Sequence, residues 1–200
     1  MTTARPRARL LASTIAMVQE FGVHGAGLAE LLKRSNTSRN SLYQHFPAGK
    51  SEVVETATRI VSRVVGSHLS VMAEQLPTTA STDQWLDELL AFWRRPLESS
   101  DYRLGSFIMA AALDELDPAV QSAAGQAFTE WTTLLSDGLV LTGLDNSTAR
   151  SLAGVLLSVI EGAIVQSRAL KSSEPFTDAH SQLKLLLGYH LAHGQAAKLV

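Results

Sequence analysis

Apolar residues recur at helical spacing along nearly the whole chain, and the alternation typical of β-strands is hard to find. The clearest case is the segment 50–75, where the apolar residues fall on one face: Val53, Val54, Ala57, Ile60, Val61, Val64 and Val65. An apolar content of 46% over 200 residues is enough to bury a folded core. The sequence therefore predicts an all-α protein.

Helix boundaries follow from start and stop residues. Pro6 suits the first turn of a helix and Gly22 suits an end. Asn36 stands where the chain must turn sharply, and Asn tolerates a left-handed backbone better than other non-glycine residues. We expect helices over residues 6–21, 27–35, 50–75, 83–98, 102–116, 118–141, 147–171 and 178–193, and a short helix that begins at Ser38.

The short helix at Ser38 carries polar side chains suited to DNA. Ser38 is a good N-cap, and Leu42 and Phe46 form an inward pair at i, i+4. The residues left to point outward are Arg39, Asn40, Ser41 and Gln44. Two short helices joined by a tight turn, with polar side chains on the second, form a helix-turn-helix.

The charge is unevenly distributed along the chain. Residues 1–50 hold seven Lys or Arg against two acidic residues, a net charge of +5, whereas residues 51–200 hold ten against seventeen, a net charge of −7. A basic head on an acidic body is expected of a protein that docks one end on a polyanion. Chance clustering is the alternative.

Other classes of protein receive little support. The chain has no Cys, which excludes disulfides and thiolate metal sites and suits a reducing compartment. No apolar run reaches the roughly 18 residues of a membrane span, and the N-terminal arginines with Leu11 and Ile15 fit a helix better than a signal sequence. The six His residues lack companions for a metal or catalytic site. We therefore expect a cytoplasmic protein that is no enzyme and needs no metal or cofactor.

Residues 9–55 combine several features in a fixed order: an opening helix, the Phe21-Gly22 turn, the helix-turn-helix, the segment Leu-Tyr-Gln-His-Phe at 42–46, and Lys50 at the next helix start. In this combination the segment resembles the DNA-binding domain of TetR-family transcriptional repressors. The extension Phe-Pro-Ala-Gly-Lys at 46–50 is similar to the LmrA-like branch of the family. The resemblance implies a DNA-binding domain over residues 1–50 and an effector-binding and dimerisation domain over residues 51–200.

The chain departs from the family pattern at three places. Ala26 and Gly27 replace the usual Thr or Ser cap of the second helix, Leu32 takes the place of a small residue, and Asn36 replaces the usual turn glycine. These changes bear on how closely the two short helices cross.

The DNA-binding residues that we expect have two kinds of role. Free amides at the helix start, with Thr37 and Ser38, can bind a phosphate oxygen, and the family resemblance assigns Tyr43, His45 and Lys50 to the sugar-phosphate backbone. Base edges are within the chemistry of Arg39, Asn40, Ser41 and Gln44, with Arg39 suited to guanine. The alternatives are packing for Tyr43 and a helix C-cap for His45. Arg5, Arg7 and Arg9 fit either a minor-groove contact or a solvated tail.

Large apolar side chains in the second half of the chain are candidates for an effector cavity, which the family resemblance implies. They are Trp85, Phe92, Trp93, Phe107, Met109, Phe128 and Trp131. A small lipophilic ligand would suit such a lining. Ordinary core packing is the alternative for each of these residues.

The segment 147–171 carries small residues at every fourth position: Gly154, Ser158 and Gly162. Such a stripe lets another helix approach closely, and with Leu183 and Leu187 of the last helix it predicts a homodimer built from the last two helices of each subunit. The alternative is that the stripe packs within one subunit.

These observations predict a ligand-responsive repressor whose dimer binds a palindromic double-stranded DNA operator and is released by a lipophilic effector. A constitutive helical DNA-binding or adaptor protein without an effector is the main alternative. A helical enzyme is the more distant one.

Overall fold

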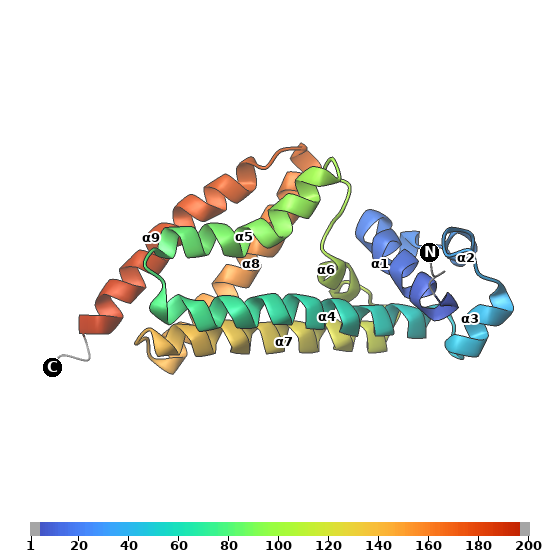
Figure 1. Cartoon of the computed structure of the whole chain (residues 1–200), viewed down its shortest axis with the longest axis horizontal. Coiled ribbons are helices and arrows are strands. Elements are labelled where there is room, and N and C mark those ends of the chain that lie inside the picture. The colour runs from blue at the N-terminus through green and yellow to red at the C-terminus, as the bar shows by residue number, and fades with distance from the viewer. Residues whose placement is uncertain (1–4, 197–200) are drawn as a thin grey trace. The chain divides into compact units, whose positions relative to one another are not determined.

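The computed structural model describes residues 5–196, with side chains described as far as residue 192. Over this range the chain forms α-helices and one 3-10 turn and contains no strand, as the sequence predicts. In chain order the elements are α1 (Pro6–Gly25), α2 (Leu28–Arg34), α3 (Arg39–His45), α4 (Lys50–Gln75), the 3-10 turn η1 (Leu76–Thr78), α5 (Thr82–Ser99), α6 (Phe107–Ala112), α7 (Pro118–Leu141), α8 (Asn146–Leu170) and α9 (Glu174–Ala196). Figure 1 shows these helices.

Most predicted boundaries agree with the structure within a few residues. The predicted stop at Gly22 is a kink, because Gly22 has a φ of 74° and a further turn of helix follows it to Gly25. The largest difference is α6, which covers only Phe107–Ala112 of the predicted helix 102–116. Asp101 and Tyr102 both have a φ of 54°, a conformation that no helix continues, and Ser106 then caps α6.

The described chain divides into two compact units. The first contains residues 5–64 and 104–127, and the second contains residues 65–103 and 128–196. Residues 5–50, the described part of the predicted DNA-binding domain, lie wholly within the first unit, which also contains residues 51–64 of α4, all of α6 and residues 118–127 of α7.

The first unit is organised around α1. Leu10, Met17 and Val18 of α1 are buried, as are Leu31 of α2 and Leu42 of α3. Polar contacts also join α1 to the segment that precedes and follows α6. The Gly105 amide donates to the Gln19 carbonyl at 2.8 Å, and His24 Nε2 lies 3.4 Å from the buried Asp114 carboxylate.

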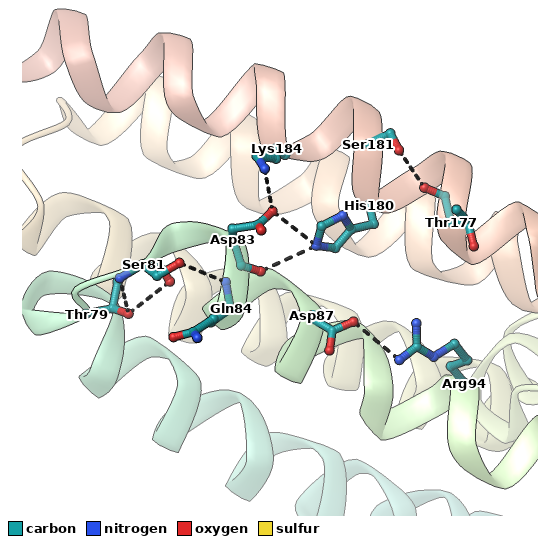
Figure 2. Close-up of polar contacts among 10 residues, drawn as sticks. All are labelled: Thr79, Ser81, Asp83, Gln84, Asp87, Arg94, Thr177, His180, Ser181 and Lys184. Atoms are coloured by element: carbon teal, nitrogen blue, oxygen red, sulfur yellow. Dashed lines mark hydrogen bonds and ion pairs between the residues drawn. The ribbon is translucent and has the colours of Figure 1, made fainter.

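The second unit contains α5, α8 and α9, which pack against one another. The Trp85 indole donates to the Met72 carbonyl at 2.7 Å, which ties α5 to α4 inside the core. Figure 2 shows the joint between α5 and α9, where Lys184 Nζ lies 2.9 Å from the Asp83 carboxylate and His180 lies beside the same carboxylate.

Helix α8 is long and apolar enough to cross a membrane, judged by length and composition alone. Its most apolar 18-residue window has a mean hydropathy of 1.5, and half of that window is buried inside the structure. The sequence-based expectation that no segment is long and apolar enough for a membrane span is therefore wrong for α8. Core helices of globular proteins share these properties, and ten side chains of α8 are buried against the rest of the unit.

Candidate nucleic-acid interface

Helix α3 is held by an apolar side and presents a polar one. Leu42 is fully buried and Phe46 is 1% exposed, which confirms the predicted inward pair. Ser38 is the N-cap, and its hydroxyl accepts a hydrogen bond from the Ser41 amide at 3.1 Å. The anchored side and the cap fix the direction in which the remaining side chains point.

The predicted DNA-binding side chains of α3 lie together on one exposed surface. The exposed members are Ser38, Arg39, Asn40, Tyr43, Gln44 and His45. Ser41 and Thr37 are half-buried, and the Thr37 hydroxyl lies 2.6 Å from the Ser35 hydroxyl, so it is already engaged within the turn. The surface offers a guanidinium, two amides and a phenol, which can bond to base edges and phosphates.

The turn between α2 and α3 adopts the conformation that the sequence predicts. Asn36 has a φ of 46°, in the left-handed region where glycine is more usual. The Thr37 amide donates to the Leu32 carbonyl at 3.0 Å and closes the turn. The chain therefore forms a helix-turn-helix without the turn glycine.

The Tyr43 ring packs against the loop that follows α3. Gly49 has a φ of 72°, and a Cβ at this position would lie 3.1 Å from Cε1 of the Tyr43 ring. The tyrosine is nevertheless 46% exposed, so its ring is supported on one side and open to solvent on the other. Packing against the protein and contact with the sugar-phosphate backbone of DNA are thus compatible roles for this residue.

Lys50 has a partner that the sequence does not reveal. Its ammonium donates to the Val23 carbonyl at 2.7 Å, near the end of α1, and the residue is half-buried. Burial lowers the pKa of Lys50, and the nearby Asp114 carboxylate opposes that change. Its predicted phosphate contact stays a prediction, and in this structure the ammonium joins α4 to α1.

The three N-terminal arginines differ in role. Arg9 donates from Nε to the Ser35 carbonyl at 2.8 Å and from Nη2 to the Asn36 carbonyl at 2.9 Å. Arg7 lies over the Phe46 ring, 5.2 Å from its centroid, and Arg5 is exposed. The sequence does not reveal these hydrogen bonds of Arg9, because its acceptors lie 26 and 27 positions away along the chain.

The candidate effector residues fall into two groups. Trp85, Phe107 and Trp131 are 2–3% exposed and form part of the core, whereas Phe92, Trp93, Met109 and Phe128 are half-buried. Phe107 and Met109 belong to the first unit and the others to the second.

One hollow lies beside Phe92. It has a volume of about 560 Å³, and its lining is His68, Glu88, Ala91, Phe92, Arg95 and Pro96. The His68 and Phe92 rings stack with centroids 4.2 Å apart, and Trp93 meets both edge-on. Burial lowers the pKa of the His68 imidazole, which lies beside this hollow.

The small-residue stripe of α8 is open in the single chain. A Cβ added at Gly154 or Gly162 would meet no atom within 4 Å, and Ser158 is exposed. Exposed apolar side chains accompany the stripe: Val155, Val165, Leu185 and Tyr189. Leu183 and Leu187, in contrast, are 2% and 0% exposed, because they pack inside their own subunit and have no surface left to offer a partner.

Metal-ligand geometry is absent from the part of the chain that the structure describes. No three His, Asp or Glu side chains gather there as a metal site would require.

Two family models match the chain. Residues 10–57 match the model described as "Bacterial regulatory proteins, tetR family", and residues 84–182 match the model described as "Transcriptional regulator LmrA/YxaF-like, C-terminal domain". The first match covers the helix-turn-helix, and the second covers most of α5 to α9.

Sequence relatives extend over almost the whole chain. It is similar to an uncharacterized HTH-type transcriptional regulator of Mycobacterium tuberculosis, at 29% identity over 91% of this chain and 94% of the relative. The HTH-type transcriptional regulator LmrA of Bacillus subtilis is 26% identical over 94% of this chain and 99% of its own. These matches agree with the predicted LmrA-like branch.

Solved structures share the fold. A TetR transcriptional regulator from Legionella pneumophila aligns with a TM-score of 0.78 at 18% identity, over 93% of this chain and 99% of its own. The reduced form of Escherichia coli NemR aligns with a TM-score of 0.69 at 21% identity, over 90% of this chain and 96% of its own.

Proposed function

The chain belongs to the TetR family of transcriptional regulators, with an LmrA/YxaF-like C-terminal domain, and we propose that it is a ligand-responsive repressor that binds a roughly palindromic operator as a homodimer. A small lipophilic effector releases it from DNA. The protein acts in the cytoplasm, where its operator is accessible.

The observation that carries the proposal is the exposed polar side of α3. Arg39, Asn40 and Gln44 are exposed on a helix whose other side is fixed by Leu42 and Phe46. A short helix of this kind enters the major groove, where such side chains distinguish base pairs. Two subunits related by two-fold symmetry would read two half-sites, which makes the operator palindromic.

The proposed dimer uses the open faces of α8 and α9. The small residues Gly154, Ser158 and Gly162 permit close helix approach, and Leu185 and Tyr189 supply apolar area beside them. Apolar residues left exposed in a single chain are more easily understood when a second copy covers them.

The proposed effector site is the hollow at Phe92. Phe92, Ala91 and Pro96 offer apolar contact to a lipophilic ligand, and Glu88 and Arg95 place charged groups in the same lining. An effector that binds the DNA-incompetent state more tightly weakens operator affinity by its differential affinity for the two states, typically about 1–3 kcal/mol.

The test begins with selection of double-stranded fragments by the purified protein, followed by sequencing and by a search for compounds that release the bound DNA. We expect one enriched palindromic sequence and at least one releasing compound. Absence of DNA binding even at low salt, where phosphate contacts are strongest, would reject the proposal, as would failure to enrich any sequence at higher salt, where non-specific binding is weakened.

A constitutive DNA-binding protein is the second candidate. It is favoured by the burial of Trp85, Phe107 and Trp131, which are 2–3% exposed and serve as core residues of their units. Thermal-shift measurements against lipophilic compounds separate the two functions. Stabilisation that Phe92→Ala abolishes supports an effector site, whereas an unchanged melting temperature with every compound supports the constitutive protein.

A further inference from the structure

Arg9 contacts the helix-turn-helix at its turn. Its guanidinium donates to two consecutive carbonyls, those of Ser35 and Asn36, at 2.8 and 2.9 Å. Ser35 is the C-cap of α2, so the guanidinium supplies donors where helix carbonyls lack them and places a positive charge at the negative end of the helix.

The turn between α2 and α3 contains an unfavourable backbone conformation that these hydrogen bonds can stabilise. Asn36 holds a left-handed φ of 46° that costs a non-glycine residue free energy. Only Thr37 separates Asn36 from Ser38, the N-cap of α3. The position of the Asn36 carbonyl therefore determines where the recognition helix begins and how its polar side is directed.

We propose that Arg9 is a positioning residue for DNA recognition: it holds the α2–α3 turn through the Ser35 and Asn36 carbonyls and so sets the orientation of Arg39, Asn40 and Gln44. It acts through the turn and makes no DNA contact of its own. This inference rests on the proposed operator binding.

The first experiment compares Arg9→Gln, Arg9→Lys and the full-length wild type on the selected operator. Arg9→Gln removes the charge and the two-pronged contact, and we expect a roughly tenfold loss of affinity, which is about 1.4 kcal/mol. Arg9→Lys keeps the charge, but an ammonium group lacks the planar pair of N–H donors with which the guanidinium bonds both carbonyls. We therefore expect an operator affinity between those of the wild type and Arg9→Gln. Arg59→Gln is the matched control, because it removes the same charge from α4, where Arg59 pairs with Glu55.

Salt dependence separates positioning from phosphate contact. A phosphate contact contributes about 0.9 to the slope of log affinity against log salt concentration, and a positioning residue contributes nothing. We expect Arg9→Gln to keep the wild-type slope. Because each dimer carries two copies of Arg9, a slope reduced by about 1.8 would overturn the inference.

The third experiment tests the link to the turn. Asn36→Gly allows the left-handed conformation without strain, so the loss of affinity caused by Arg9→Gln should be smaller in the Asn36→Gly background. An equal or larger loss there would overturn the inference, as would an affinity loss equal to the unfolded fraction measured by circular dichroism. If Arg9→Gln does not fold, Arg9→Lys carries the same comparison.

These outcomes are distinct from failure of the proposed function. A wild-type protein without sequence-specific DNA binding rejects the proposed function before any variant is compared. A wild-type protein that binds its operator, with Arg9→Gln binding equally well, rejects the role of Arg9 alone.

Discussion

At the residue scale, Arg39 is the strongest candidate for a base contact. It is exposed in the first turn of α3, and arginine can bond to guanine through two hydrogen bonds. We expect Arg39→Ala to cost about 1–3 kcal/mol of operator affinity and to relax preference at one base pair. The measurement is affinity for a panel of operators that differ at single positions, with Arg59→Ala as the control. An equal loss on all sequences would identify a phosphate contact instead.

Lys50 is expected to contribute to the stability of the fold. Its ammonium is bonded to the Val23 carbonyl at 2.7 Å and is half-buried, so its removal leaves an acceptor near the end of α1 without this donor. We expect Lys50→Ala to reduce the free energy of unfolding by roughly 1.5–3 kcal/mol. Chemical denaturation measures this change. The phosphate role predicted from the sequence would return if the salt slope of DNA binding by the dimer fell by about 1.8 while stability stayed unchanged.

Residue roles were predictable where they depend on local spacing. Leu42, Phe46 and Ser38 stand at helix positions that fix burial and capping, and the structure agrees. Arg9 and Lys50 donate hydrogen bonds to backbone carbonyls 26 or more positions away. Every residue has a backbone carbonyl, so the amino-acid sequence does not indicate which one accepts. Contacts of that kind follow only from the tertiary structure.

At the element scale, the loop after α3 depends on Gly49. Its φ of 72° is unfavourable for other residues, and a Cβ would press on the Tyr43 ring at 3.1 Å. We expect Gly49→Ala to destabilise the protein by about 1–2 kcal/mol, and to weaken operator binding further by moving Tyr43. Thermal denaturation and operator titration measure the two effects.

The matched control is Gly125→Ala in α7, where an added Cβ meets no atom within 4 Å. Alanine is the better helix former there and should raise stability by up to about 1 kcal/mol. A Gly49→Ala protein with wild-type stability and affinity would contradict the role given to this loop.

The joint between α5 and α9 should respond to pH. Lys184 and, to a lesser extent, His180 hold the pKa of the Asp83 carboxyl below its ordinary value of 3.8 (Figure 2). A depressed folded pKa gives stability that is present above the unfolded pKa and is lost as pH falls through the folded one. We expect Asp83→Asn to lower the melting temperature slightly at pH 7 and to match the wild type at a pH well below 3.8.

Asp87→Asn is the control for that measurement, because Asp87 pairs with Arg94 of its own helix at 3.3 Å and leaves the α9 contact untouched. It should reduce stability less than Asp83→Asn at pH 7. A difference between Asp83→Asn and the wild type that persists unchanged to the lowest pH would show that the carboxylate charge is not the cause.

Element prediction succeeded where periodicity is long and failed at a short helix. The 26 residues of α4 repeat the apolar pattern many times, and the structure has the predicted bounds. The prediction is wrong for Val64 of the apolar face, which is 57% exposed. The six residues of α6 give little pattern. Asp101 before it is a common turn residue, but the left-handed Tyr102 is not, so the sequence does not show that two such residues stand in a row. Periodicity alone therefore extended that helix too far.

At the scale of the whole molecule, the charge division agrees with the placement of the DNA-binding surface. Residues 1–50 carry a net charge of +5 and include α1 to α3, whereas residues 51–200 carry −7. Attraction of the first segment and repulsion of the remainder would orient the protein on approach to DNA, and this orientation stays a prediction.

The proposed dimer gives the last prediction. Val155 is 40% exposed on the open face of α8, and an arginine at this position would be buried without a partner if a second subunit covers the face. Desolvation of an unpaired charge costs several kcal/mol, so Val155→Arg should raise the dimer dissociation constant by roughly 100-fold or more. Analytical ultracentrifugation measures the dissociation constant, and operator affinity should fall with it because one subunit reads only a half-site.

Val71→Arg provides the comparison for the dimer test. Val71 is 50% exposed and belongs to α4, a different helix from α8 and α9. Its substitution by arginine makes the same change in size and charge as Val155→Arg. It should leave both the dimer and operator affinity as in the wild type, since an exposed arginine stays hydrated. A Val155→Arg protein that remains as dimeric as Val71→Arg would place the subunit contact elsewhere, and the open stripe of Gly154, Ser158 and Gly162 would then need another explanation.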